Sequence, residues 1–325
     1  MMHTKKLLVA SLSHEEAITQ IVLNNKSAFE VPIDVLTIDT ILNEYQIFDE
    51  LTDRGAHIRW FKNNRIEISN HSHSLLNRVL CIPDTLFKNF HPDDSVYAKH
   101  EFSAYLGFAF NAFQGVDNLH PCGVCAAPRS LPQQWKLAAS LNLSVPSYYW
   151  GSALRHGHQK STQRYTEKTA ISPHHTHQET IAQATKPSKF SPTIDTNQYH
   201  KPSLVYSDIY DFLNWSNPVP PSQTSPIFCF EKPLGYPVFL TLIGTQIFAP
   251  EVAHLPNKLT QCLFTQCHNM AQLSQQFIGE FLFFIHKNQY VFACFNPEII
   301  RSRHYPGFER FVLSHLVPEV KKCLY

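Results

Sequence analysis

Residues 226–250 read PIFCFEKPLGYPVFLTLIGTQIFAP, and residues 279–298 read GEFLFFIHKNQYVFACFNPE. Continuous apolar runs bounded by Gly, Pro and Asn predict buried strands in both stretches, paired as hairpins around Gly244-Thr245 and around residues 286–289. The expected strands are 227–230, 238–243, 246–248, 281–285 and 290–295. The expected helices of this half are 206–215, 271–278 and 308–324, the last broken near Pro318.

The N-terminal half predicts a β-α-β unit. A strand at 5–12 is followed by a helix through Val22, which a capping box of Ser13 and Glu16 opens, and by a strand at 32–38. We expect the two strands to be parallel, because a helix connects them. Further elements are expected as a hairpin of 57–61 and 65–68 about Asn63-Asn64, a strand at 78–82, helices at 95–113 and 131–141, and a strand beginning near 145–150. The fold class is therefore α/β.

Composition excludes several classes of protein. The chain has 325 residues, which suggests about two domains, and 27 Lys+Arg against 26 Asp+Glu give a formal charge of +1. That charge argues against a nucleic-acid binder. The 10 glycines form neither a GxGxxG nor a GxxxxGK[ST] loop, which argues against Rossmann and P-loop nucleotide sites.

Targeting signals are not apparent in the sequence. The apolar run of residues 7–12 is too short for a signal peptide, and no run is long enough for a membrane helix. The eight cysteines do not form a dense disulfide framework. We therefore expect a cytoplasmic protein with reduced thiols, no membrane partner and no nucleic-acid partner; a homo-oligomer is compatible with the sequence.

The chain between Ser152 and His200 differs sharply in composition. Only 11 of these 49 residues are hydrophobic, against 43% of the whole chain. Such a segment buries too little apolar surface to offset the entropy of ordering it, so we expect a disordered insertion at 151–202. The histidines at 174, 175 and 177 lie within it and are interpreted as solvated linker rather than as metal ligands.

A second cluster, His120-Pro-Cys122-Gly-Val-Cys125, contains three soft ligands. A structural zinc site would need a fourth ligand, and the nearest alternative, Cys262 with Cys267-His268, has an unusual spacing. A redox pair would need Cys122 at the start of a helix that follows a strand. An incidental loop with two thiols is the simpler interpretation, and the sequence leaves metal binding by Cys122 and Cys125 open.

Three stretches together resemble the ATP-grasp superfamily, in the branch of microviridin- and graspetide-type peptide maturases. Residues 131–150 look like the helix-then-strand segment of that family, 226–250 align with its central strands, and 279–298 are similar to its terminal metal-binding strands. The resemblance implies an ATP-grasp-like fold with an N-terminal pre-ATP-grasp domain at 1–125. It also implies a connecting helix and strand at 126–150 and a grasp-like domain at 203–325, after the insertion.

The resemblance also implies ATP and Mg²⁺ as cofactors, with chemistry through an acyl phosphate. The positions that match its functional residues are Lys201 for a phosphate-binding lysine, Glu280 for the first metal acid and Asn296 for the metal-binding asparagine. The sequence is equally compatible with roles that involve no metal: Glu280 as an exposed acid at a strand edge, and Asn296 as a turn residue before Pro297.

Other positions of that pattern carry the wrong chemistry. The sequence has Leu131 for a lysine, Phe239 for an arginine, Pro237 for an aspartate, Cys294 for the metal-bridging glutamate and Cys229-Phe230 for a Gln-Glu pair. Mg²⁺ prefers oxygen ligands to sulfur. Loss of the cations and carboxylates should abolish acyl-phosphate formation. We therefore expect an impaired relative that binds a peptide or protein partner; the alternative is an active ATP- and Mg²⁺-dependent ligase that modifies a peptide.

Overall fold

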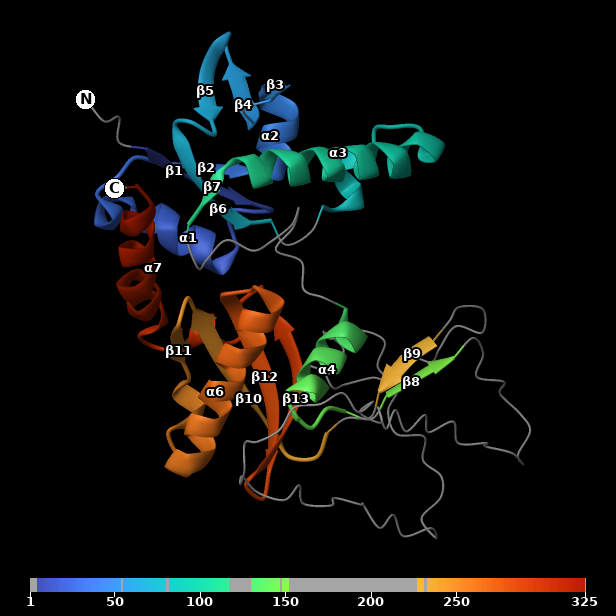
Figure 1. Cartoon of the computed structure of the whole chain (residues 1–325), viewed down its shortest axis with the longest axis vertical. Helices are drawn as coiled ribbons and strands as arrows, with labels where there is room; N and C mark the ends of the chain where they lie inside the picture. The colour runs from blue at the N-terminus through green and yellow to red at the C-terminus, as the bar shows by residue number, and fades with distance from the viewer. Residues whose placement is uncertain are drawn as a thin grey trace. The chain divides into compact units, whose positions relative to one another are not determined.

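A computed structural model describes residues 5–53, 55–79, 82–116, 130–146, 148–151, 227–230 and 233–324 (Figure 1). Contacts divide the chain into one unit of residues 1–146 with 233–325 and a second of residues 147–232. The expected helix at 206–215, the insertion, the His120 to Cys125 cluster and Lys201 lie outside the described residues.

A parallel sheet forms the centre of the N-terminal domain. Its strands β1 (Lys6–Ser11), β2 (Ile33–Thr37), β6 (His73–Arg78) and β7 (Gln114–Gly115) lie in the order β2-β1-β6-β7 and are all parallel. Helix α1 (Ala17–Asn24) connects β1 to β2. The predicted β-α-β unit is confirmed.

Two hydrophobic cores cover the faces of this sheet. On one face, Leu7 and Val9 pack in a cluster with α1 and with α7 (Phe308–Leu324). On the other, Leu8 and Ala10 pack with α2 (Ile38–Glu44) and α3 (Pro92–Ala112). Successive side chains of β1 point to opposite faces of the sheet, and both faces are covered. This explains why β1 is a continuous run of apolar residues.

Two details of the N-terminal prediction are wrong. Helix α1 is capped by Glu16 rather than Ser13, because the Glu16 carboxylate accepts both the backbone N–H and the hydroxyl of Thr19 at 2.8 Å. The strand expected at 78–82 lies earlier, as β6. Four of its six residues are polar and all six are buried, so hydrophobic pattern alone does not reveal it.

A three-stranded antiparallel sheet joins the second core through Ile58, Trp60 and Ile68. It consists of β3 (Gln46–Thr52), β4 (Gly55–Lys62) and β5 (Arg65–Ser69), in that order. The β4–β5 hairpin is confirmed, and Asn63 and Asn64 form its turn with φ of 51° and 60°. Strand β3 and helix α2 were not predicted.

The C-terminal sheet contains the two stretches that decide the fold. Its order is β11-β10-β12-β13, all antiparallel. The strands are β10 (Tyr236–Ile243), β11 (Gln246–Phe248), β12 (Ile278–His286) and β13 (Gln289–Asn296). Both predicted hairpins are confirmed.

The helices of this half differ from expectation. Helix α6 spans Asn257–Ser274, so the helix expected at 271–278 is wrong: only its first turn is helical, and Ile278 already belongs to β12. Helix α7 continues through Pro318 without a break. Its buried side chains on both sides of the proline, such as Leu316 and Val320, pack in the same core and hold the helix together.

The remaining elements are short. Helix α4 (Leu131–Ser140) begins with a capping box of Ser130 and Gln133, and β8 (Tyr148–Gly151) pairs with β9 (Ile227–Phe230) in the second unit. The 3₁₀ turns are η1 (Lys26–Phe29), η2 (Asp84–Phe87), η3 (Pro250–Val252) and η4 (Ser302–His304). Among the described residues, no helix combines the length and apolar character needed to cross a membrane.

Candidate functional site

Three polar residues form a row across one face of the C-terminal sheet. Glu280 of β12 is directly opposite Thr241 of β10 on one side and Asn296 of β13 on the other. Directly opposed residues of antiparallel strands point to the same face. The two described residues that the sequence predicted as metal ligands, Glu280 and Asn296, are therefore brought together.

The next row on the same face is apolar. Two residues along each strand lie Phe239, Leu282 and Cys294, which pair in the same order. Phe239 is 7% exposed and Cys294 is 4% exposed. The two positions that the resemblance assigns to an arginine and a metal-bridging glutamate are thus beside Glu280 and Asn296, and both carry buried side chains without charge.

The Glu280 carboxylate binds the backbone that follows β13. Oε1 accepts the N–H of Ser302 at 2.7 Å, and Oε2 accepts those of Arg301 at 3.1 Å and Ile300 at 3.3 Å. Burial raises the pKa of Glu280, and the donors around it oppose that rise. Both oxygens are therefore engaged in holding residues 300–302 at the start of η4.

Asn296 closes a turn at the end of β13. Its Oδ1 accepts the N–H of Glu298 at 3.0 Å, across Pro297. A side-chain oxygen that accepts the N–H two residues ahead is the usual Asx turn. The oxygen that would bind a metal is the one used by this turn.

Cys294 is inert as a ligand in this setting. Burial raises the pKa of its thiol, and the nearby Glu280 carboxylate raises it further. A thiol with a raised pKa stays protonated, and only the thiolate is a good ligand. In the described part of the chain, no three His, Cys, Asp or Glu side chains are grouped so that they could hold a metal ion.

Helix α4 fixes the outer edge of β13. The Gln134 side chain donates to the carbonyl of Phe295 at 3.1 Å and accepts its N–H at 2.7 Å. Trp135 Nε1 donates to the carbonyl of Ala293 at 2.7 Å. These bonds satisfy backbone groups of an edge strand, so the positions of Cys294 and Asn296 are rigidly set.

A buried ion pair lies on the far side of Pro297, where the two halves of the unit meet. Arg78 of β6 donates from Nη2 to Glu16 Oε1 and to the carbonyl of Pro297, each at 2.7 Å. Arg78 is 1% exposed and Glu16 is 6% exposed. The sequence did not predict this group; the available signal was a lone arginine directly before the apolar run of residues 79–82.

The pKa of Glu16 reflects its environment. Burial raises it, but the Arg78 charge and the hydrogen bonds from Arg78 and Thr19 outweigh burial, so the pKa is lowered. The carboxylate is therefore ionised and stabilises both the start of α1 and the loop after β13.

The described donors do not fit a Mg²⁺–nucleotide complex. Mg²⁺ needs six oxygens in octahedral geometry, and in the two rows only Glu280 and Asn296 offer a carboxylate or amide oxygen, both of which also accept backbone N–H groups. None of the six residues of the two rows, Thr241, Glu280, Asn296, Phe239, Leu282 and Cys294, carries a positive charge that could meet a phosphate.

Comparison by structure finds proteins of the same architecture. One is macrocyclase MdnB from Microcystis aeruginosa MRC, at 13% identity and a TM-score of 0.51, covering 99% of this chain and 100% of that one. Macrocyclase MdnC of the same organism, solved with its precursor peptide MdnA, has 12% identity and a TM-score of 0.52, with 98% and 99% covered. The ATP-grasp ligase PsnB, solved with precursor peptide PsnA2 and AMPPNP, has 11% identity and a TM-score of 0.54, with 100% and 99% covered.

The chain has the ATP-grasp fold. The similarity extends over nearly the whole of each chain, so the α/β, ATP-grasp-like fold class predicted from the sequence is confirmed. By sequence, no protein-family profile and no curated protein matches. At 11–13% identity the likeness concerns the fold, and the chemistry has to be argued from this chain's own residues.

Proposed function

We propose that this ATP-grasp-fold protein binds a peptide or protein and does not form an acyl phosphate. The observation that carries the proposal is the Glu280 carboxylate, whose two oxygens accept three backbone N–H groups of residues 300–302. A carboxylate has about four lone-pair sites, and three of those of Glu280 are used by backbone N–H groups, so little of it remains for a metal. Here the acid serves as a cap for the loop that follows β13.

The apolar row beside Glu280 supports the same proposal. Acyl-phosphate formation develops negative charge on transferring phosphoryl oxygens, which cations must stabilise. Loss of one such contact costs about 3 kcal/mol of transition-state stabilisation. Phe239 and Cys294, both buried, supply neither a cation nor an oxygen.

The partner class is drawn from the structural neighbours. MdnC was solved with a precursor peptide, and so was PsnB. Because this chain shares their fold over nearly its full length, we propose a peptide segment as its partner. The domain division predicted from the sequence, 1–125, 126–150, 151–202 and 203–325, belongs to the same proposal.

One observation favours the alternative, an active peptide ligase. Glu280 and Asn296 are opposite each other on one sheet face, as the resemblance requires of a metal pair. For ligase chemistry, Glu280 would have to release the N–H groups of residues 300–302, and Lys201 would have to supply a phosphate contact. ATP and Mg²⁺ would then be the cofactors.

Isothermal titration with ATP and Mg²⁺ distinguishes the peptide-binding protein from the active ligase. We expect no heat at millimolar ATP and no rise in melting temperature. Micromolar binding that Asn296→Ala abolishes would contradict the proposal and favour the ligase. Gln289→Ala is the matched control, because Gln289 is exposed at the opposite end of β13.

The peptide partner can be tested with a phage-displayed library of random peptides selected on the immobilised protein. We expect enriched sequences that bind with micromolar affinity equally well with and without ATP and Mg²⁺. Failure to enrich any sequence would contradict peptide binding. A selected peptide that loses the mass of one water on incubation with ATP and Mg²⁺ would instead show ligase activity.

A further inference from the structure

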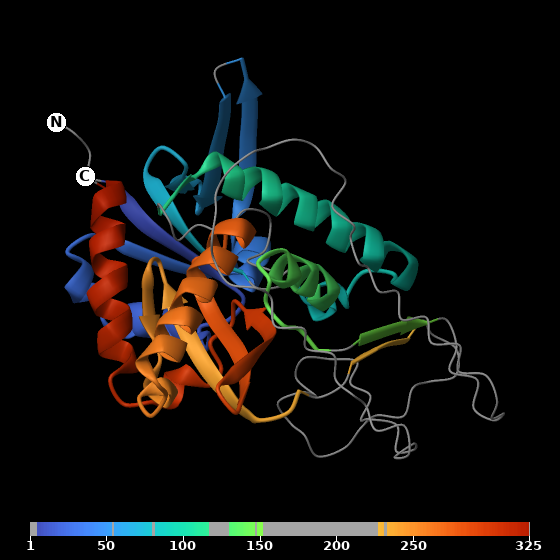
Figure 2. The same ribbon diagram turned by 60° about the horizontal axis from the view of Figure 1, so that its bottom comes forward.

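Two histidine rings are in contact on the three-stranded sheet of the N-terminal domain, whose strands project from that domain in Figure 2. His57 belongs to β4, and His71 belongs to the turn between β5 and β6. The Nδ1 atom of His57 and the Nε2 atom of His71 are 2.7 Å apart. Because His57 is half-buried and His71 is exposed, both rings can be reached from solvent.

The register of the strands brings the two rings together. Arg59 of β4 pairs with Ser69 of β5, and the two strands are antiparallel. Two residues back along β4 is His57, and two residues forward along the chain from Ser69 is His71. The N–H of Asn70 donates to a carbonyl of β4 at 3.3 Å, so the pairing continues beyond the end of β5. His57 and His71 are therefore at opposed positions, where side chains on one face are close neighbours.

The residue before His71 attaches the turn to β4. The Asn70 side chain accepts the N–H of Ile58 at 3.1 Å and donates to the carbonyl of Ala56 at 2.8 Å, on either side of His57. It also donates to the carbonyl of the last residue of α3 at 3.1 Å. The backbones that carry the two rings are thus held together by hydrogen bonds, which is the support that a preorganised binding site needs.

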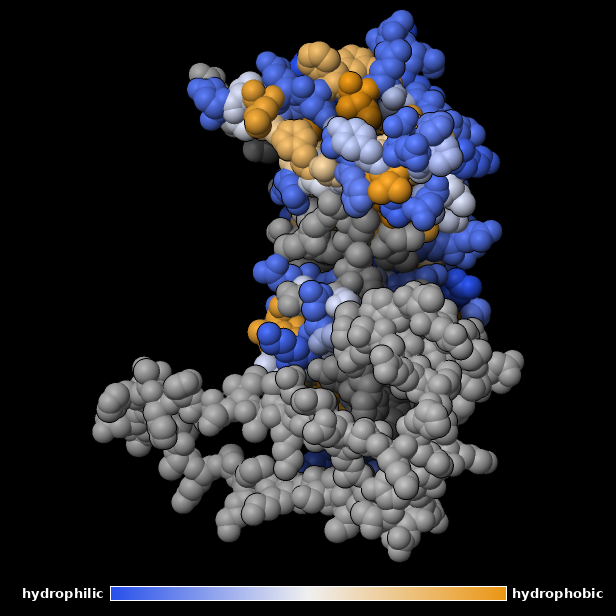
Figure 3. Space-filling model, turned by 90° about the vertical axis from the view of Figure 1, so that its right-hand side faces the viewer, coloured by the Kyte–Doolittle hydropathy of each residue, from blue (hydrophilic) through white to orange (hydrophobic). Residues whose placement is uncertain are grey.

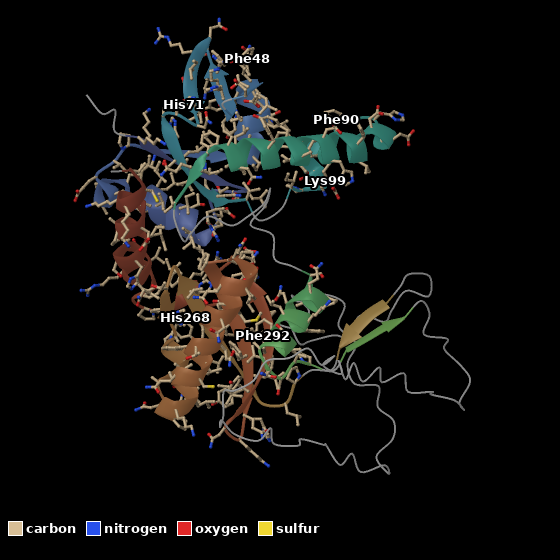
Figure 4. The ribbon with its side chains drawn as sticks, in the orientation of Figure 1. Phe48, His71, Phe90, Lys99, His268 and Phe292 are labelled. Atoms are coloured by element: carbon tan, nitrogen blue, oxygen red, sulfur yellow. The ribbon has the colours of Figure 1, made fainter. Side chains whose placement is uncertain are left out.

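The charges around the two rings are balanced. Glu50 of β3 is directly opposite His57, and its carboxylate accepts a hydrogen bond from Arg59 at 3.0 Å. The positive charge of Arg59, two residues from His57 on the same face, is therefore offset. In Figure 3 the surface at the upper end of the molecule, which includes this sheet, is mainly hydrophilic, and Figure 4 labels His71 there. Such surroundings suit a cation that keeps part of its hydration shell.

The separation of the two nitrogens indicates which kind of cation fits. With metal–nitrogen bonds of about 2.0 Å, two nitrogens bound at right angles lie about 2.8 Å apart, and two bound at the tetrahedral angle about 3.3 Å apart. The observed 2.7 Å is closer to the first arrangement. Right-angled binding by nitrogen and oxygen ligands is typical of Cu²⁺ and Ni²⁺, whereas Zn²⁺ in proteins is usually tetrahedral.

Binding requires a change of tautomer but no change of charge. In the hydrogen bond between the rings, one nitrogen donates its N–H to the other. For both nitrogens to bind a metal, the donating ring carries its proton on its other nitrogen. The exposed His71 ring also turns, so that the two lone pairs converge on one point.

We propose that His57 and His71 together bind a divalent transition-metal ion of the Cu²⁺ or Ni²⁺ type, with water as its other ligands. Two side chains suffice for this site, which agrees with the finding that the described residues contain no group of three potential ligands. The bound ion ties β4 to the turn that precedes β6 and so stabilises the folded N-terminal domain. This site is independent of the proposed function, since it uses neither the C-terminal sheet nor a peptide.

Isothermal titration of the full-length protein with NiCl₂ tests the proposal, because Ni²⁺ does not oxidise thiols. The chain has 19 histidines, so the site is identified by difference. We expect His57→Ala and His71→Ala each to weaken the same binding event by at least about tenfold, since even the loss of a partner behind a ligand costs about 10–100-fold in affinity. His91→Ala is the matched control, because His91 is an exposed histidine of the same domain outside the pair. Identical titrations of the wild type, His57→Ala and His71→Ala would overturn the proposal.

Oxidative mapping tests where the ion binds. Bound Cu²⁺ with ascorbate and oxygen oxidises the imidazoles that hold it, and mass spectrometry of the peptides locates the added oxygen. We expect His57 and His71 to be oxidised at the same Cu²⁺ concentration, and oxidation of His57 to fall in His71→Ala, whose folding circular dichroism checks. Oxidation of His57 that is unchanged in His71→Ala would contradict a shared ion. Excess Ni²⁺ should protect both rings better than equal Zn²⁺, and the reverse order would contradict right-angled binding.

Discussion

Two polar centres of the molecule, both next to Pro297, use charge in opposite ways. At one, Arg78 and Glu16 form a fully buried ion pair that also binds the Pro297 carbonyl. At the other, on the C-terminal sheet, Glu280 has no cationic partner within the described ranges and accepts backbone N–H groups instead. In both places the buried carboxylate holds a backbone segment: Glu16 holds the start of α1, and Glu280 holds residues 300–302.

The difference indicates what this chain uses its fold for. Burying a charge is costly unless each ion is well paired and hydrogen-bonded. The junction meets that condition, whereas on the sheet face the row next to Glu280 consists of the uncharged Phe239, Leu282 and Cys294. At the junction, therefore, the buried charge is offset by an opposite charge, whereas on the sheet face it is offset by backbone N–H groups alone.

The largest effect is expected from breaking the ion pair. Arg78→Met leaves the Glu16 carboxylate buried without its cation and the Pro297 carbonyl without its donor. We expect the free energy of unfolding to fall by about 3–5 kcal/mol, measured by urea denaturation. Arg78→Met with Glu16→Gln should recover part of that loss, because the orphaned charge is removed.

A small effect of Arg78→Met would contradict this view of the junction. The exposed pair of Lys62 and Glu44, at 2.7 Å, provides the comparison, and Lys62→Ala should leave the free energy of unfolding nearly unchanged. If Arg78→Met and Lys62→Ala lowered the free energy of unfolding equally, burial would not explain the importance of the Arg78–Glu16 pair.

The next effect concerns Glu280. Glu280→Ala leaves three N–H groups of residues 300–302 without their acceptor, and we expect a loss of about 3 kcal/mol in the free energy of unfolding. A metal-binding acid without other partners would behave differently: its removal would leave stability unchanged without Mg²⁺ and abolish stabilisation by Mg²⁺. Denaturation with and without Mg²⁺ therefore distinguishes a cap from a ligand.

Lowering the pH should affect the stability contributions of Glu16 and Glu280 in opposite directions. The pKa of Glu16 is lowered from its usual 4.5, so its contribution to stability is complete above pH 4.5 and is lost as the pH falls through the lower, folded-state value. The raised pKa of Glu280 acts in the opposite direction: the folded state takes up this proton first, so stability is gained as the pH falls through the raised value toward 4.5.

The measurement is urea denaturation as a function of pH. Below pH 4.5 the wild type should lose stability more steeply than the Arg78→Met, Glu16→Gln double variant, by up to about 1.4 kcal/mol per pH unit for one proton. Parallel curves for the two proteins would contradict the lowered pKa of Glu16.

Sequence pattern predicted the C-terminal sheet well, for an identifiable reason. Its hairpins have apolar runs ended by turn residues, such as Gly244 with φ of 61°, and their register follows from short connections. The resemblance to the ATP-grasp family singled out Glu280 and Asn296, and the structure places them opposite each other. What those side chains bind could not be predicted, because the donors come from residues 300–302, which no local pattern assigns to Glu280.

The missed elements have a physical reason in common. Two buried polar residues of strand β6 find partners elsewhere in the chain: His73 bonds to Asp34, and Arg78 bonds to Glu16 and the Pro297 carbonyl. Strand β3 is the converse, with apolar residues that are exposed. In both, long-range structure overrides the local relation of hydrophobicity to burial on which pattern analysis depends.

The smallest effect tests whether Asn296 is a turn residue or a metal relic. The turn needs a side-chain oxygen that accepts the Glu298 N–H, so Asn296→Ala should lose about 1 kcal/mol in the free energy of unfolding. Asn296→Asp keeps that acceptor but puts a second carboxylate opposite Glu280, so we expect it to be destabilised as well, by an amount that Mg²⁺ does not change. At a metal site the added charge of aspartate opposite Glu280 would be harmful without Mg²⁺ and helpful with it. Thermal denaturation of both variants with and without Mg²⁺ decides the matter, because a turn residue predicts the same ranking in both conditions. Reversal of that ranking by Mg²⁺ would show that the sheet face still recognises a cation, and the contrast with the Arg78–Glu16 junction would no longer hold.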